Sequence, residues 1–381
     1  MPVFILFITV IMLSSCSNGP VGGVLSIRLI QPTADHCRYT IAPATLYTVD
    51  NIYELRGRIG SVVTFDENLL DSNQSDQSIV LGTGAGLESI VVDFGRSGST
   101  FIPLNYDTLF GASLYFAVEQ GFLLFSSLDT VSDVAKLVPN LSDTKIVHEA
   151  RRTFKGEDSE AVDNAEYKPY FINDNPEDIR NYFFSFPTTP LIEGMPLGVN
   201  VGIMVHEFTH LVFHYLARKQ RLKDQTGFAD YLSLNTERAL NEGLADYFGF
   251  LVAKDPGFFL CTFPNEPRDL SQAKQFSQEY HNEISQEKVV APHSGGAVWA
   301  AIQYQIGQAI GDHMVNGRSL VRLMGGLMNC ATRTEGKLKF DFGKVAKCHL
   351  DSLAQLRSDY QATAQAVYSR YLGPYGDSSA K

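Results

Sequence analysis

The residues of this chain best suited to chemistry are two histidines and a glutamate within one predicted helical turn. His206, Glu207 and His210 form a His-Glu-x-x-His pattern inside an apolar run. Residues four apart lie on one face of a helix, so both imidazoles can bind a single metal ion. Glu207 points at a neighbouring angle, where it can hydrogen-bond a water on the metal. The pattern predicts a zinc site with a general base beside it, and three fixed residues also recur by chance.

A second predicted helix, over 235–254, supplies the acidic residues that such a site needs. A catalytic zinc takes three protein ligands and keeps one position open, and Glu242 is the expected third ligand. Asp246 lies four residues further on the same face. We expect Asp246 and Asn241 to orient the ligands from behind the metal. Both carboxylates lie in an apolar stretch, where an uncompensated charge is costly, so a solvated acidic face is the poorer interpretation.

Together, the His-Glu-x-x-His pattern at residues 206–210 and the Asn-Glu-x-x-x-Asp pattern at residues 241–246 resemble the gluzincin metallopeptidases. The resemblance is closest to their thermolysin-like branch. It implies an α+β fold, in which an edge-stranded sheet and helices precede a helical subdomain. It also implies a zinc-dependent endopeptidase with Zn²⁺ as cofactor, a peptide or protein as substrate and Glu207 as general base.

The same resemblance assigns roles to two further segments. His293 precedes a predicted helix that runs towards Ile310, and in the thermolysin-like enzymes a histidine at this place hydrogen-bonds the oxyanion. Asn164 and Ala165 precede a probable strand and would contact the substrate backbone, since an unpaired edge strand is a template for an extended peptide. A helix-capping histidine and an ordinary turn are the alternatives. The family's calcium sites and catalytic tyrosine have no convincing counterpart here.

The rest of the chain is expected to form a β-rich region and a largely helical catalytic domain. Short β-type runs occur at 24–29, 47–58, 61–65, 78–81 and 89–94, which predicts a β-rich N-terminal region over 16–104. A helix is predicted over 106–128. The metallopeptidase domain would span 105–381, with active-site helices over 203–220 and 235–254 and a helical C-terminal subdomain over 256–375.

The first 15 residues predict an export signal. Residues 3–13 are almost wholly apolar but too few to span a bilayer, which takes about 20. The Leu-Ser-Ser-Cys sequence ending at Cys16 resembles the lipobox of bacterial lipoproteins, which implies a lipid anchor on Cys16 and a place in the cell envelope. No Lys or Arg precedes Arg28, a departure from the usual basic start, and a buried strand is the alternative.

Composition and cysteine content limit the partners. The chain has 31 Lys+Arg against 42 Asp+Glu, a net charge of −11, which disfavours nucleic acid and anionic membrane surfaces. We expect the protein to associate with the membrane through the lipid on Cys16 instead. Four cysteines remain besides Cys16, which permits two disulfides in an exported chain, and Cys330 and Cys348 are the most local pair. Buried free thiols are the alternative.

Two other functions fit the same residues. One is a surface lipoprotein that uses a non-catalytic metal site for binding or assembly. The other is a zinc amidase that acts on cell-wall material. The intact Glu207 argues against the first, because a purely structural zinc needs no general base.

Overall fold

The computed structural model describes residues 23–33, 38–65, 86–128, 134–148, 165–172, 175, 178–185, 196–263, 268–290 and 292–376. They form a mixed α+β fold with several sheets, in agreement with the predicted class. The strands are β1 (Leu25–Pro32), β2 (Tyr39–Leu46), β3 (Val49–Asn51), β4 (Arg56–Gly57), β5 (Gly60–Phe65), β6 (Leu87–Ser89), β7 (Phe94–Ser97), β8 (Thr100–Pro103), β9 (Lys145–His148), β10 (Ala165–Phe171), β11 (Ile179–Ser185), β12 (Thr332–Thr334) and β13 (Lys337–Lys339). The helices are α2 (Tyr106–Leu128), α3 (Val134–Leu137), α4 (Val201–Phe213), α5 (Lys219–Lys223), α6 (Tyr231–Ala253), α7 (Gln278–Ile284), α8 (His293–Ile310), α9 (His313–Cys330), α10 (Phe342–Leu356) and α11 (Gln361–Tyr371).

The larger sheet has the strand order β10-β11-β9-β5-β4-β3, and β6 pairs with β5. Strands β5, β9 and β11 are parallel, whereas β10 runs antiparallel to β11 at one edge. Alternate residues of the parallel strands face opposite sides of the sheet. The main core receives Val62, Ile146 and Phe183, and a small cluster on the other face receives Val63, Val147 and Phe184.

Strands from the N-terminal region belong to this same sheet. β5 pairs with β9 from Ser61 opposite Lys145 to Thr64 opposite His148. The boundary expected at residue 104 therefore does not separate two sheets. A parallel pair needs a long crossover between its strands, so the partner of β5 comes from much later in the chain. The smaller sheet, of order β2-β1-β8-β7, packs through β1 against α2.

Several N-terminal strands differ from the sequence-based expectation. The run over 47–58 is broken by a 3-10 turn at Ile52–Glu54, after which Leu55 takes a left-handed conformation with φ 42°. The run over 89–94 is the gap between β6 and β7, and β2 was not predicted. The run over 78–81 lies outside the described residues.

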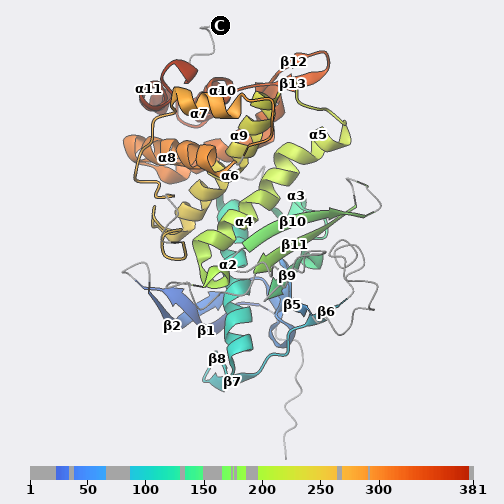
Figure 1. The fold of residues 1–381 in the computed structure, drawn as a ribbon. Coiled ribbons are helices and arrows are strands. Elements are labelled where there is room, and N and C mark those ends of the chain that lie inside the picture. The colour runs from blue at the N-terminus through green and yellow to red at the C-terminus, as the bar shows by residue number, and fades with distance from the viewer. Residues whose placement is uncertain are drawn as a thin grey trace, which may run out of the picture.

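Helix α2 matches its predicted bounds and lies in the centre of the molecule (Figure 1). By length and composition it could cross a membrane, but 78% of its most apolar window is buried inside the protein. It packs against β1 and β5 on one side and against α4 on the other. Helix α2 is therefore the core element on which the sheets and the helix of the His-Glu-x-x-His pattern meet.

The two predicted active-site helices are present, with shifted ends. The predicted helix over 203–220 is α4, followed by a π-helical stretch at His214–Arg218 and by α5. Helix α6 begins at Tyr231, earlier than predicted, because the Asp230 carboxylate caps it by accepting the Ser233 N–H at 2.8 Å. Towards the C-terminus the chain is mostly helical, as expected, and α7 to α11 gather at the opposite end from β7 and β8 (Figure 1).

The sequence permits two disulfides, and the pair predicted to be the most local is confirmed. Cys330 and Cys348 form a disulfide between the end of α9 and α10, with a Cα–Cα distance of 5.9 Å. Cys261 is also disulfide-bonded. Cys16 and Cys37 lie outside the described residues.

Candidate metal centre and cleft

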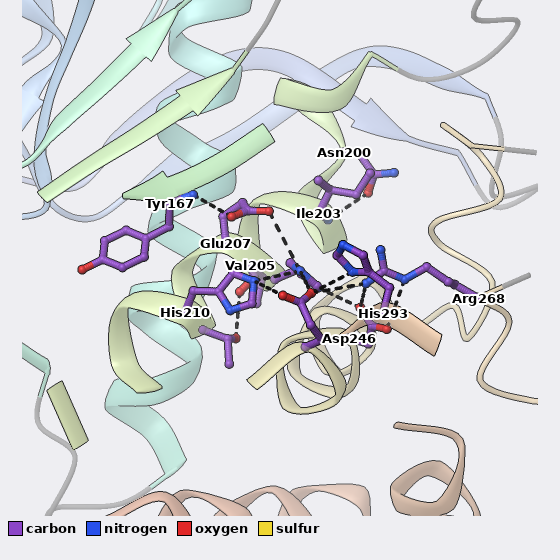
Figure 2. A network of polar contacts seen from close by, with 12 residues as sticks. Tyr167, Asn200, Ile203, Val205, Glu207, His210, Asp246, Arg268 and His293 are labelled. Atoms are coloured by element: carbon purple, nitrogen blue, oxygen red, sulfur yellow. Dashed lines mark hydrogen bonds and ion pairs between the residues drawn. The ribbon is translucent and has the colours of Figure 1, made fainter. Parts of the chain in front are cut away.

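Asn200 fixes the start of α4. Its side-chain oxygen accepts the Ile203 N–H at 3.3 Å, which is the capping contact at a helix N-terminus (Figure 2). Its amide nitrogen donates to the Phe258 carbonyl at 3.0 Å and to the Thr262 hydroxyl at 2.9 Å. This one buried side chain therefore ties the beginning of α4 to the turn segment that follows α6.

Helices α4 and α6 cross at two glycines. A Cβ atom on Gly249 would lie 2.6 Å from the Gly202 carbonyl oxygen, closer than any side chain tolerates. The absence of a side chain lets the two backbones approach. At this spacing the acidic face of α6 lies opposite the two histidines of α4.

Three side chains converge across this crossing. The Nε2 atoms of His206 and His210 are 3.1 Å apart, and the Glu242 carboxylate lies 3.4 Å from His206 and 3.8 Å from His210. Two ligands that bind one tetrahedral zinc at 2.0–2.1 Å are roughly 3.3 Å apart. The donor atoms and their spacing thus fit a zinc ion, which His206, His210 and Glu242 could hold.

Asp246 lies behind this group and contacts His206. Its Oδ1 is 2.7 Å from the His206 Nδ1, so Nδ1 donates to Asp246 while Nε2 faces the other ligands. Asn241, also predicted to support the ligands, lines the cleft and lies near enough to His210 to raise its pKa slightly against the effect of burial. The structure therefore places Asp246 against His206 and Asn241 on the cleft wall near His210.

Glu207 is held beside the proposed metal position. Its Oε2 accepts the backbone N–H of Tyr167 on β10 at 2.7 Å, and its Oε1 lies 3.9 Å from the Nε2 of His206 (Figure 2). One ligand atom from each of His206, Glu207 and His210 lies within 4.8 Å of the other two, so this carboxylate is also close enough to contact an ion held by the histidines. Burial raises the pKa of the Glu207 carboxyl to about 7, although His206 opposes the shift. A carboxyl group in this range can both accept and release a proton near neutral pH.

The charges of the site favour a cation among the three ligands. Burial lowers the pKa of His210 to about 4, which leaves its imidazole neutral. Burial alone would raise the pKa of Glu242, but His210, His206 and His293 lower it well below its usual value. Burial also lowers the pKa of His206, yet Asp246 and Glu242 outweigh it and raise the value to about 9. The same carboxylates would attract a divalent ion at this point, and its binding would release the His206 proton.

His293 is the first residue of α8 and lies at the cleft. Its Nδ1 is 3.1 Å from Glu242 Oε2, and its side chain is 58% exposed. Gly296 brings it there, because a Cβ atom on Gly296 would lie 2.6 Å from the Glu242 Cβ, so α8 packs directly on α6. The predicted contact with an oxyanion stays a prediction. What the structure adds is a direct contact between His293 and an expected metal ligand.

A cleft of about 490 Å³ surrounds these residues. Its walls come from α4, α6, the start of α8, β10 and the segment after α6. They include Ala165, Tyr167, Pro169, Leu197, Ile203, Phe259, Phe263, Arg218 and Arg268. Among the described strands, β10 pairs only with β11, so its other edge is open towards the cleft. Ala165 lies in this wall, and its predicted contact with the substrate backbone stays a prediction. Asn164 falls outside the described residues.

Sequence reasoning missed four features of this site. Arg268 donates to both oxygens of Asp246, at 2.8 and 3.3 Å, and no pattern in the sequence distinguishes it from other loop arginines. The backbone N–H of Tyr167 that holds Glu207 carries no sequence signal at all. The segment around Phe259 closes one side of the cleft, and its ring meets that of His206 edge-on at 5.4 Å.

The fourth feature is the π-helical stretch after α4. Arg218, the last residue of this stretch, makes a bidentate pair with the buried Glu237, at 2.5 and 2.9 Å. A π-helical turn often occurs at a functional site, because it re-aims side chains that a regular helix would place elsewhere. Here it leaves His214 and Arg218 on the cleft wall.

No protein-family model matches this chain, and no curated protein matches it significantly.

Proposed function

We propose that this protein is an exported, zinc-dependent endopeptidase of the gluzincin type, with a thermolysin-like catalytic domain. The observation that carries the proposal is the convergence of His206, His210 and Glu242 at the spacing of tetrahedral zinc ligands, next to Glu207. A structural zinc site is usually closed by four protein ligands. Three ligands beside an open cleft and a held carboxylate are the arrangement of a hydrolytic site.

His206, His210 and Glu242 would hold the zinc ion in this enzyme. When bound, the ion would polarise the scissile carbonyl and lower the pKa of a water molecule towards neutrality. Asp246 keeps the Nδ1 proton of His206 in place, which leaves Nε2 free to bind.

Glu207 is the general base of the proposed reaction. Its carboxylate accepts a proton from the attacking water and later delivers that proton to the leaving amine. The Tyr167 N–H fixes one oxygen at 2.7 Å, so the other oxygen is directed towards the ligand cluster. His293, at the mouth of the cleft, would donate a hydrogen bond to the developing oxyanion.

The substrate that this cleft suits is an extended peptide. The open edge of β10 offers backbone groups in the register of a further strand, and Ala165 has too small a side chain to block an approach to it. Phe259, Phe263 and Ile203 provide apolar surface for a substrate side chain. A peptide or protein substrate is therefore proposed.

Export is proposed on independent grounds. The Cys330–Cys348 disulfide is typical of proteins in an oxidising compartment. The apolar segment and the Leu-Ser-Ser-Cys sequence ending at Cys16 support a signal peptide and lipidation at Cys16, which would anchor the protein to the bacterial cell envelope. A Cys16→Ser variant that leaves the membrane fraction would support the anchor.

Metal analysis combined with a cleavage assay tests the proposal. The purified protein should contain one zinc per chain and should cleave members of a fluorogenic peptide library. A chelator should abolish the cleavage, and added zinc should restore it. A protein that holds zinc but cleaves no peptide would support the binding lipoprotein instead, and cleavage of cell-wall fragments alone would support the amidase.

A further inference from the structure

Arg268 lies on the wall of the cleft beside the proposed metal site, and it is not itself one of the proposed ligands. Its guanidinium donates to Asp246 through NH2 at 2.8 Å and through Nε at 3.3 Å. The same Asp246 oxygen that receives NH2 lies 2.7 Å from the His206 Nδ1. Arg268, Asp246 and His206 therefore form a continuous chain of contacts that ends at the imidazole of a proposed ligand. Figure 2 shows Arg268 beside Asp246.

An aromatic ring, in addition to the ion pair with Asp246, holds Arg268 in this position. Its guanidinium carbon lies 3.9 Å from the centre of the Phe259 ring, and the edge of that ring meets His206. A guanidinium stacked on an aromatic face and paired with a carboxylate has little freedom to move. Phe259 thus supports both ends of the chain of contacts.

The electrostatic reason for an arginine here is the burial of Asp246. This carboxylate is completely buried, and it lies near a second carboxylate, that of Glu242. A buried carboxylate is held in one orientation by its cationic and N–H partners, so Asp246 without Arg268 would turn away from His206. This would remove the acceptor that orients His206. The NH2 of Arg268 is also 3.8 Å from Glu242 Oε2, so its charge acts on both acidic residues of α6.

We infer that Arg268 is a positioning residue of the metal site: it holds Asp246 in place, and Asp246 in turn presents the Nε2 of His206 for zinc. The inference rests on the proposed zinc site. It adds a residue from outside the two ligand helices, supplied by the segment that follows α6.

Zinc affinity is the measurement that tests this role. The dissociation constant is measured by competition with a chromophoric chelator at one pH and ionic strength, for wild type and for Arg268→Gln. Loss of a group that supports a ligand from behind typically weakens metal binding by roughly 10–100-fold, and that is the expected change. Arg268→Lys, which keeps the charge but loses the bidentate geometry, should weaken binding less, and it replaces Arg268→Gln if that variant does not fold.

Arg218 offers a matched control. It makes another bidentate pair with a buried carboxylate beside this cleft, to Glu237. Its charge acts on His210 and Glu242 from a distance, but within the described residues no hydrogen bond or ion pair joins Arg218 to a proposed metal ligand. Arg218→Gln should lower the melting temperature of the zinc-free protein while its zinc affinity stays close to the wild-type value. If Arg268 has a merely structural role, Arg268→Gln should likewise lower the melting temperature and leave the zinc affinity close to the wild-type value.

A double mutant decides whether Arg268 acts through Asp246. If it does, Asp246→Asn combined with Arg268→Gln should bind zinc about as weakly as Asp246→Asn alone, because the second change removes a partner that no longer has a role. Fully additive losses, or an Arg268→Gln protein that binds zinc as tightly as wild type, would overturn the inference while leaving the zinc site intact. A wild-type protein without zinc affinity would overturn the proposed metal site itself and this inference with it.

Discussion

Buried histidines occur at two places in this molecule, and they have different roles there. At one place the histidine serves packing, and at the other the histidines belong to the candidate metal centre. In the C-terminal helices, His349 is fully buried, and its Nε2 and Nδ1 lie 2.6 Å from the Ser319 hydroxyl and 2.8 Å from the Tyr368 hydroxyl. Tyr368 also accepts a hydrogen bond from Gln303 at 2.9 Å. Every partner is neutral, and both ring nitrogens are satisfied.

In the cleft, the ring nitrogens of His206 and His210 instead face each other and a carboxylate. Their Nε2 atoms are 3.1 Å apart, and neutral hydroxyl groups are absent from the described contacts of these two nitrogens. Such a group of acceptors is stable only when a proton or a metal ion lies between them.

Burial of a histidine therefore does not by itself identify a functional site. Burial lowers the pKa of His349 to about 3, so it stays neutral and serves packing. The carboxylates around His206 raise its pKa to about 9 in spite of burial. What marks the site is the convergence of acceptors on a point that the cleft can reach.

Removing a ligand from the cleft cluster should have the largest effect. His206→Ala or Glu242→Ala leaves two ligands, too few for a tight zinc site, so bound zinc and peptide cleavage should both be lost. His349→Gln, the control from the other cluster, should retain one zinc per chain. Metal analysis of the three purified variants measures the difference, and a Glu242→Ala protein with full zinc content would refute the ligand assignment.

Glu207→Gln should separate catalysis from metal binding. Glutamine keeps the shape and the hydrogen bond from Tyr167 but cannot take a proton, so zinc should be retained. Turnover should fall by roughly 10²–10⁴-fold, the usual contribution of a general base. Steady-state kinetics with a fluorogenic peptide measures it. Cleavage at the wild-type rate would show that the activity belongs to another site or to a contaminant.

His293→Ala should have a smaller effect on the same reaction. The loss of one donor to the oxyanion typically costs roughly 10²–10³-fold in kcat. Since that contact is made mainly in the transition state, kcat and kcat/KM should fall together. A change confined to KM, or a loss of zinc, would instead mean that the contact of His293 with Glu242 is its main role.

The smallest expected effect belongs to the packing cluster and concerns stability. The folded pKa of His349, about 3, lies below its ordinary value of 6.5. Between these values the unfolded chain binds a proton that the folded chain excludes, so the free energy of unfolding falls as the pH falls, by about 1.4 kcal/mol per pH unit. Above pH 6.5 this contribution is fully present.

Denaturant unfolding of wild type and His349→Gln between pH 6 and pH 4 tests this expectation. The variant should be less stable at neutral pH, but its stability should fall less steeply on acidification. Parallel curves for the two proteins would show that His349 is charged in the folded state.

Much of the candidate site follows from helical periodicity in the sequence. The i, i+4 spacing places His206 and His210 on one face of α4, and it places Glu242 and Asp246 on one face of α6. The local sequence also predicts α2 with the observed bounds. These features depend on contacts between residues close in the chain, where backbone geometry leaves few choices.

Contacts between distant segments could not be derived in this way. Three contacts join segments that no periodicity relates. Strand β5 pairs with β9, the Tyr167 N–H donates to Glu207, and Arg268 donates to Asp246. They arise because α4 and α6 approach at Gly202 and Gly249, and because the core around α2 sets where every other element packs. The chain's local spacing selects the groups that can bind a metal, and only the packing of the whole core decides which partners orient them.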